Sequence, residues 1–203
     1  MASALVIVLT LIVASQPALA PTLLYERAAI FRGEYWRLWT GHLVHFGPSH
    51  LFWNLLVFAL ASIWAERLAP GRTRILLAVA PAAIGLALLA LDPALATYGG
   101  LSGLAAAALA FLAFTQLAQN PPATAPATPP APSELHAQAS ASDRWFWRAV
   151  LALILLKIAA EFAADQPLFA RFAPSGIRSV PLAHLAGFLV ASTVHRTRRR
   201  RPV

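Results

Sequence analysis

The stretch Tyr98-Gly-Gly-Leu-Ser-Gly103 opens a long run of alanine and leucine. It places one hydroxyl group, on Ser102, between glycines at the start of a segment apolar enough for a membrane helix. A serine in a membrane helix usually bonds back to its own helix or to a neighbouring one, so this motif alone is weak evidence for catalysis. Its meaning depends on two other stretches that carry histidine within apolar sequence: His45-x4-His50-x3-Asn54 and Ala183-His184-x2-Gly187.

Composition indicates an integral membrane protein. Of the 203 residues, 59% are hydrophobic and 12% are charged, and the mean hydropathy is +0.64. Soluble domains are about half apolar. The net charge of +8 comes largely from short basic segments between or after the apolar runs, which is typical of topology signals. We therefore expect the lipid bilayer as a partner and no nucleic acid. The absence of cysteine excludes disulfides, thiolate zinc sites and cysteine nucleophiles.

Six apolar segments predict an all-α integral membrane protein built as a six-transmembrane-helix bundle. The predicted spans are residues 2–20, 49–68, 75–91, 101–117, 145–164 and 180–194, and a loop with a Pro-Gly turn is expected at 67–74. Residues 21–48 mix aromatic and charged side chains, which suits the membrane interface. The expected organisation is a membrane domain over 1–195, a Pro/Ala-rich cytoplasmic loop within it at 120–142, and a basic cytoplasmic tail at 196–203.

The basic residues also predict an orientation. If the tail is cytoplasmic, ten basic residues lie inside and five outside, so both termini are predicted to be cytoplasmic. Ser102, His184 and the His50/Asn54 pair then fall on three different helices at one depth near the outer face. Such polar groups are costly in lipid and normally face the interior of a bundle.

Two interpretations of these polar groups remain open. In the first, each simply makes a hydrogen bond between helices. In the second, Ser102 is a nucleophile and His184 the general base that takes its proton. His50, Asn54 and the backbone N–H of Ser102 would then stabilise an oxyanion. Glycines near the two reactive residues would let their helices approach closely.

Four motifs in register resemble the rhomboid intramembrane serine proteases. They are Glu34-Tyr-Trp36-Arg37, His45-x4-His50-x3-Asn54, Gly100-x-Ser102-Gly103 and Ala183-His184-x2-Gly187. The resemblance implies a hydrolase with an outward-facing cavity and a Ser102/His184 dyad, with His50 and Asn54 in the oxyanion site and no metal or cofactor. It implies structural roles for the remaining motif residues: His45, Trp36, Arg37, Gly100, Gly103 and Gly187.

One position departs from the family pattern. In well-studied rhomboids an aromatic ring four residues after the nucleophile packs on the base histidine, whereas this chain has Ala106 there. We therefore expect His184 either to have another supporting ring or to be less firmly oriented.

A narrower resemblance is to the rhombosortases, a compact bacterial branch of the superfamily. It is carried by the near-absent N-terminal extension, by Trp36-Arg37-x2-Thr40-Gly41-His42 and by the pair Lys157-x3-Glu161. It implies a protein of the bacterial cytoplasmic (inner) membrane with its active site open to the periplasm. The implied function is protein sorting, in which the substrates are exported proteins that carry a C-terminal Gly-Gly motif, a hydrophobic helix and basic residues.

Lys157 and Glu161 attract interest without any family, because opposite charges four residues apart on a membrane helix can neutralise each other. We predict that they line the cavity and hold a polar part of the substrate. In the alternative, Glu161 lies at the membrane interface and Lys157 extends its amine to the same level.

Three other functions stay open at this stage. One is a general rhomboid protease that cleaves single-span proteins near their outer membrane boundary. Another is a rhomboid-like pseudoprotease that binds membrane clients without cutting them. The third is a transporter or metal site built on the histidines, since His42 and His45 are three residues apart, but no acidic partner accompanies them and we expect no metal.

Overall fold

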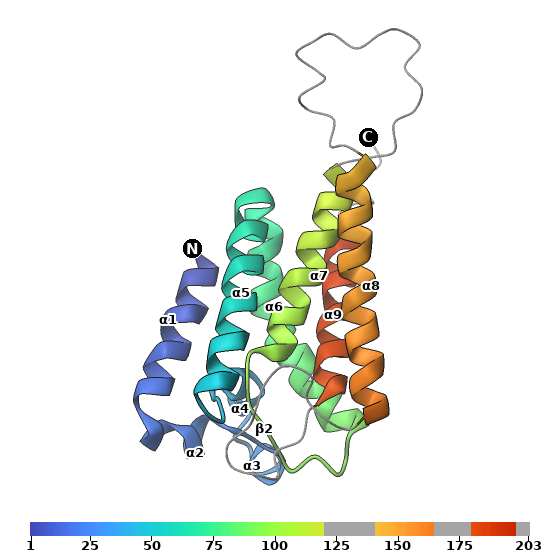
Figure 1. The fold of residues 1–203 in the computed structure, drawn as a ribbon. Coiled ribbons are helices and arrows are strands. Elements are labelled where there is room, and N and C mark those ends of the chain that lie inside the picture. The colour runs from blue at the N-terminus through green and yellow to red at the C-terminus, as the bar shows by residue number, and fades with distance from the viewer. Residues whose placement is uncertain (120–140, 165–179, 198–203) are drawn as a thin grey trace, which may run out of the picture.

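The computed structural model describes residues 1–119, 141–164 and 180–197. Within these ranges six helices have 14 residues or more: α1 (Ala2–Ser15), α5 (Pro48–Leu68), α6 (Pro70–Leu91), α7 (Ser102–Gln119), α8 (Ala141–Ala164) and α9 (Pro181–Arg196). Figure 1 shows these helices running alongside one another in a single bundle. The predicted helical fold is confirmed. The predicted loop over 120–142 lies outside the described residues up to position 140, as does the tail from position 198.

Three helices, α5, α6 and α7, are long and apolar enough to cross a membrane, and the bent pair of Ala2–Ser15 with Pro17–Leu23 is a fourth candidate. Of the other two described long helices, α8 carries Arg148, Lys157 and Glu161, and α9 has only 16 residues. Neither passes the same test of length and charge. Six spans and cytoplasmic termini therefore stay a prediction.

The first helix is shorter than predicted from the sequence. Residues 2–20 were expected to form one span, but α1 ends at Ser15, and Gln16 has φ −127° and ψ 78°, outside the helical region. The cause is Pro17, whose ring disfavours helical conformation in the residue before it. The chain then bends by 99° into η1 (Pro17–Leu19) and α2 (Ala20–Leu23).

The junction between α5 and α6 also differs from the prediction. A loop was expected over residues 67–74, but only Ala69 separates the two helices. Pro70 opens α6, where its missing N–H and fixed φ do no harm. Arg67 and Arg74 are consequently exposed side chains at helix ends. Similarly, α8 starts at Ala141, inside the segment predicted as a loop.

Short elements cover one end of the bundle. They are β1 (Tyr25–Glu26), α3 (Arg27–Phe31), α4 (Arg37–Thr40) and η2 (Gly41–Leu43), and β1 pairs antiparallel with β2 (Thr97–Tyr98). In Figure 1 they lie at the end of the bundle opposite the labelled N-terminus.

The Arg37 guanidinium joins the start of α4 to α2 and to the turn that precedes α4. It is 6% exposed and donates hydrogen bonds to the carbonyls of Pro21 (2.8 Å) and Leu24 (2.7 Å) and to the Glu34 carboxylate (2.8 Å). The neighbouring Trp36 indole donates to the Thr22 carbonyl at 3.2 Å. Trp36 and Arg37 thus hold the backbone of residues 21–24 against the start of α4.

Helix α7 lies at the centre of the bundle. It contacts α5, α6, α8 and α9. Of its candidate span 56% is buried, against 33% for α5 and 39% for α6. Half of its buried residues are alanine, which lets neighbouring backbones approach closely. Residues at the first turn of α7 are therefore within reach of several helices.

Candidate active site

Ser102 is the first residue of α7, and the chain reaches it through a short connection from β2. This connection is held by two hydrogen bonds from its backbone. The N–H of Gly100 donates to the carbonyl of Gly41 at 3.2 Å, and the N–H of Leu101 donates to Nε2 of His45 at 3.3 Å. The region around η2 thus fixes the place where α7 begins.

His45 supports the residue just before Ser102. Its Nδ1 lies 3.1 Å from the carbonyl of Leu43, which can only accept a hydrogen bond, so Nδ1 carries the proton and Nε2 is free to accept from Leu101. Burial lowers the pKa of His45 to about 4, although the Leu43 carbonyl opposes the shift. The ring is therefore neutral at ordinary pH.

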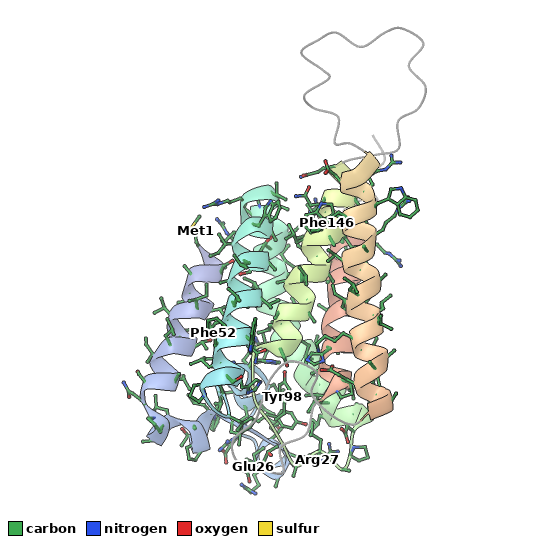
Figure 2. All side chains as sticks on the ribbon, viewed as in Figure 1. Met1, Glu26, Arg27, Phe52, Tyr98 and Phe146 are labelled. Carbon is green, nitrogen blue, oxygen red and sulfur yellow. The ribbon has the colours of Figure 1, made fainter. Side chains whose placement is uncertain are left out.

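Tyr98 is a site residue that the sequence analysis missed. Its hydroxyl donates to the Gly100 carbonyl at 3.0 Å and lies 3.5 Å from Nδ1 of His42. Burial raises the pKa of Tyr98 to about 12, and this shift is opposed by hydrogen bonds from the Ser102 side chain and the Gly103 backbone. A buried tyrosine hydroxyl needs partners, and its place in the quoted motif was the available signal. Figure 2 shows Tyr98 at the end of the bundle away from Met1 and Phe146.

His50 and Asn54 lie one turn apart on α5 and are both buried. Both side chains face Gly100: a Cβ added there would lie 2.7 Å from the His50 ring and 3.3 Å from Nδ2 of Asn54. The backbone N–H of Phe46 donates to Nδ1 of His50 at 3.3 Å, so Nε2 of His50 carries the proton. Asn54 Nδ2 is buried without a hydrogen-bond partner in the described part of the chain. Two side-chain donors thus lie beside Gly100, two positions before Ser102.

His184 reaches this region because α7 and α9 are in backbone contact. A Cβ at Gly103 would lie 3.0 Å from the carbonyl oxygen of Ala183, and a Cβ at Gly187 would collide with the carbonyl oxygen of Gly103. The adjoining residues Ser102 and His184 are therefore brought to the same level. Over the described residues the Ser102 side chain bonds Tyr98, and no direct hydrogen bond joins it to His184. Catalytic hydrogen bonds are often loose before substrate binds.

A charged cluster meets the other side of the His184 ring. Glu161 Oε2 lies 2.7 Å from Nδ1 of His184, and Glu161 Oε1 lies 2.7 Å from Nζ of Lys157. The Glu161 side chain is 3% exposed and that of Lys157 is 32% exposed. The expected ion pair between Lys157 and Glu161 is present, and the Glu161 carboxylate is buried among the helices of the bundle. Both oxygens of the Glu161 carboxylate are engaged in these contacts. Lys157 is the more accessible residue of the pair. A contact of either residue with substrate stays a prediction.

The histidines do not gather around a metal in the described part of the chain, where no group of three His, Asp or Glu side chains has suitable geometry. His42 and His45 use their ring nitrogens for hydrogen bonds, and Nε2 of His42 lies 3.1 Å from the carbonyl of Pro81.

Comparison with protein-family models matches a Rhomboid domain over residues 32–201. The chain belongs to the rhomboid family. Members of this family are intramembrane serine proteases. A search for similar curated proteins finds no match.

In this rhomboid the small residue Ala106 stands where an aromatic ring was expected. The structure supplies a different support for His184, since the Glu161 carboxylate fixes its Nδ1. The spacing of Lys157 and Glu161 on one helix predicted their pairing, but it did not predict the contact of Glu161 with His184. No spacing rule relates residues on two helices, so only the fold brings these two together.

Proposed function

We propose that this rhomboid is an intramembrane serine endopeptidase in which Ser102 is the nucleophile and His184 the general base. The observation that supports it best is the convergence of Ser102, His184 and the His50/Asn54 pair at the first turn of α7, from three helices. Chance would not often gather a hydroxyl, a base and two donors in one region of an apolar bundle.

The reaction follows from the groups present. As the Ser102 oxygen bonds to the substrate carbonyl carbon, its proton moves to Nε2 of His184. The carbonyl oxygen becomes an oxyanion, which accepts hydrogen bonds from His50, Asn54 and the Ser102 backbone N–H. That N–H has no partner within the helix because it belongs to the first turn of α7, whose positive dipole end also favours the anion.

The intermediate then collapses and the peptide C–N bond breaks, while the proton on Nε2 passes to the leaving amine. A water molecule gives a proton to Nε2 and its oxygen attacks the acyl-enzyme ester. The second collapse frees the carboxylic acid and returns the proton to the Ser102 oxygen. Each proton lost by a nucleophile is therefore carried by His184 and given to a leaving group.

We further propose a substrate class and a location. The protein would lie in the bacterial inner membrane with the site open to the periplasm. It would cleave exported proteins near a C-terminal Gly-Gly motif, which frees them from a hydrophobic anchor. The support is the rhombosortase resemblance of the Lys157/Glu161 pair and the Trp36-to-His42 motif. A Gly-Gly segment is a poor helix former, so it can become extended at an active site.

The test is a cleavage assay in membranes with two matched reporters, one with the Gly-Gly tag and one with Leu-Leu in its place. We expect wild-type protein to cut only the first, and Ser102→Ala to cut neither. Equal cutting of both reporters would favour a general rhomboid that cleaves single-span proteins. Absence of cutting by folded wild-type protein would favour a client-binding pseudoprotease.

A further inference from the structure

We propose that Glu161 is the positioning residue of His184, so that the site works as a Ser102–His184–Glu161 triad. Lys157 supports this triad by pairing with the Glu161 carboxylate. The proposal deepens the proposed function and rests on it for its catalytic meaning. A rhomboid that needs a carboxylate would differ from one that uses a Ser–His dyad.

In the hydrogen bond between Glu161 and His184, the histidine is the donor. Glu161 Oε2 and His184 Nδ1 are 2.7 Å apart, on α8 and α9, and both side chains are buried. The Lys157 ammonium lies 2.7 Å from the other carboxylate oxygen and stabilises the ionised form of Glu161. An ionised carboxylate can only accept hydrogen bonds, so Nδ1 of His184 must carry the proton.

The tautomer decides which ring nitrogen can act as a base. With the proton on Nδ1, the lone pair of the neutral ring is on Nε2. Nε2 is therefore the nitrogen that can take a proton from Ser102. Without Glu161, both tautomers are open to His184, and the one with the proton on Nε2 cannot act as a base towards Ser102.

Glu161 also stabilises the charge that His184 acquires during the reaction. When Nε2 takes the Ser102 proton, the ring becomes a cation whose Nδ1–H already donates to an anion at 2.7 Å. This charge-assisted hydrogen bond stabilises the imidazolium, and Glu161 keeps its negative charge throughout. The proton balance of the reaction is unchanged, because Glu161 neither gains nor loses a proton.

Lys157 has a separate task. Its Nζ lies 3.3 Å from Nδ1 of His184, but a nitrogen that carries a proton cannot accept another hydrogen bond there. The Lys157 ammonium therefore serves Glu161, and it compensates a carboxylate that would otherwise be buried in an apolar bundle without an opposite charge. Before the reaction, the Lys157 ammonium, the Glu161 carboxylate and the neutral His184 ring together carry no net charge.

The first test measures how fast a small fluorophosphonate labels Ser102 in purified protein in lipid. We expect Glu161→Gln to slow labelling on the order of 10²- to 10⁴-fold, the usual contribution of a positioned acid–base group. Glu161→Asp should restore part of the rate. In peptide cleavage, kcat should fall while KM changes little. Unchanged labelling with a raised KM would overturn the proposal in favour of substrate binding by Glu161.

Glu66→Gln is the matched control. Glu66 is also buried on a bundle helix, but its carboxylate accepts the backbone N–H groups of Ala2 (2.8 Å) and Ser3 (3.0 Å). The same substitution there should lower the unfolding temperature and leave the labelling rate at the wild-type value. An equal loss of labelling in both variants would show that any buried charge matters, and would overturn a specific role for Glu161.

The second test does not need catalysis. Nitrogen-15 NMR of the wild-type protein, with the His184 signals assigned by comparison with His184→Gln, should show the proton of the neutral ring on Nδ1. Glu161→Gln should give a mixture of tautomers. A wild-type ring with its proton on Nε2 would overturn the proposal. Wild-type protein that is not labelled at Ser102 would contradict the proposed function instead, and the NMR result would still decide the role of Glu161.

Discussion

At position 100, both the backbone conformation and a neighbouring side chain require a glycine. The residue has φ 123°, a conformation that side chains disfavour, and the His50 ring occupies the space next to its Cα. The carbonyl of Gly100 also accepts the Tyr98 hydroxyl. A glycine at position 100 therefore lets the donors on α5 come close to the backbone two positions before Ser102.

We predict that Gly100→Ala lowers Ser102 labelling by fluorophosphonate at least about 10-fold, because the new methyl group pushes His50 away. Gly33→Ala is the control, since Gly33 has φ 103° but no atom within 4 Å of the place that a Cβ would take. It should lose about 1 kcal/mol of stability from backbone strain and keep its labelling rate. Equal labelling by Gly100→Ala and wild type would show that His50 has no role at the oxyanion.

The buried histidines near η2 predict a pH dependence of stability. Burial lowers the pKa of His42 to about 4 and that of His45 to about 4, against about 6.5 for an unfolded histidine. Between these values the unfolded chain binds more protons, so stability present above pH 6.5 is lost as the pH falls towards 4. The loss is at most about 3 kcal/mol per histidine.

The measurement is the free energy of unfolding in detergent at pH 7 and pH 4.5, for wild type and His45→Gln. A glutamine can still accept the Leu101 N–H but does not titrate in this range. We expect the difference between the two pH values to be smaller for the variant. An identical difference would mean that His45 is protonated as easily in the folded protein as in the unfolded one.

At the scale of elements, the contact between α7 and α9 depends on two glycines. Gly103 and Gly187 bring the two helix backbones together, and the Gly103 carbonyl occupies the space that a side chain at position 187 would need. Small residues of this kind are the usual means by which membrane helices approach closely. The same contact sets the level of His184 relative to Ser102.

We predict that Gly187→Ala destabilises the protein by about 1 to 3 kcal/mol, the usual cost of overpacking, and slows Ser102 labelling because α9 is displaced. Gly71→Ala is the matched control. Gly71 lies in the first turn of α6 with no atom within 4 Å of an added Cβ, so alanine there should be neutral or slightly stabilising. Wild-type stability and labelling for Gly187→Ala would show that the two helices can separate without loss.

The sequence predicted elements better than their ends. Apolar length identified the central helices α5 and α7 closely, because a membrane segment must be helical along its whole length. Errors arose at prolines, where two effects compete: Pro17 ended α1 early, whereas Pro70 began α6 inside a basic segment that resembled a loop. The local sequence does not say which effect dominates.

The candidate site shows the same limit. Ser102, His184, His50 and Asn54 were identified because polar residues stand out in apolar sequence and carry family motifs. The partner of His184 was not identified, because the contact with Glu161 crosses from α8 to α9. Local spacing predicts an ion pair on one helix, while a contact between helices requires the fold.

At the scale of the whole molecule, many large apolar side chains lie on the outer surface and several charged or polar ones lie in the interior, the reverse of the arrangement in a soluble protein. Large apolar side chains such as Leu60 and Leu156 are 66% and 64% exposed, while charged and polar groups such as Glu161 and His50 are buried. A soluble protein with so much apolar surface would aggregate. In a bilayer, the same surface faces lipid and the polar site is enclosed by helices.

The two ends of the bundle should therefore face opposite compartments. The short elements and the α6–α7 connection lie at one end, and the start of α1 and the end of α9 point to the other (Figure 1). Because the chain has no cysteine, a single introduced thiol is the only reactive one. We predict that Ala94→Cys, at the exposed α6–α7 connection, reacts with a membrane-impermeant maleimide in intact bacterial cells. Thr197→Cys should react only after the membrane is opened, since it lies beside the basic segment that is predicted to be cytoplasmic.

Leu60→Cys is the control that separates orientation from insertion. Leu60 lies within α5, and 66% of its surface is exposed in the isolated chain. In a bilayer this surface meets hydrocarbon, where a thiol does not ionise and a polar maleimide does not enter, so no labelling is expected in intact or opened cells. The reverse pattern for Ala94→Cys and Thr197→Cys would place the site on the cytoplasmic side and exclude exported substrates. Labelling of Leu60→Cys at the rate of Ala94→Cys would mean that this surface meets water. The bilayer would then not explain why apolar side chains lie outside and polar ones inside.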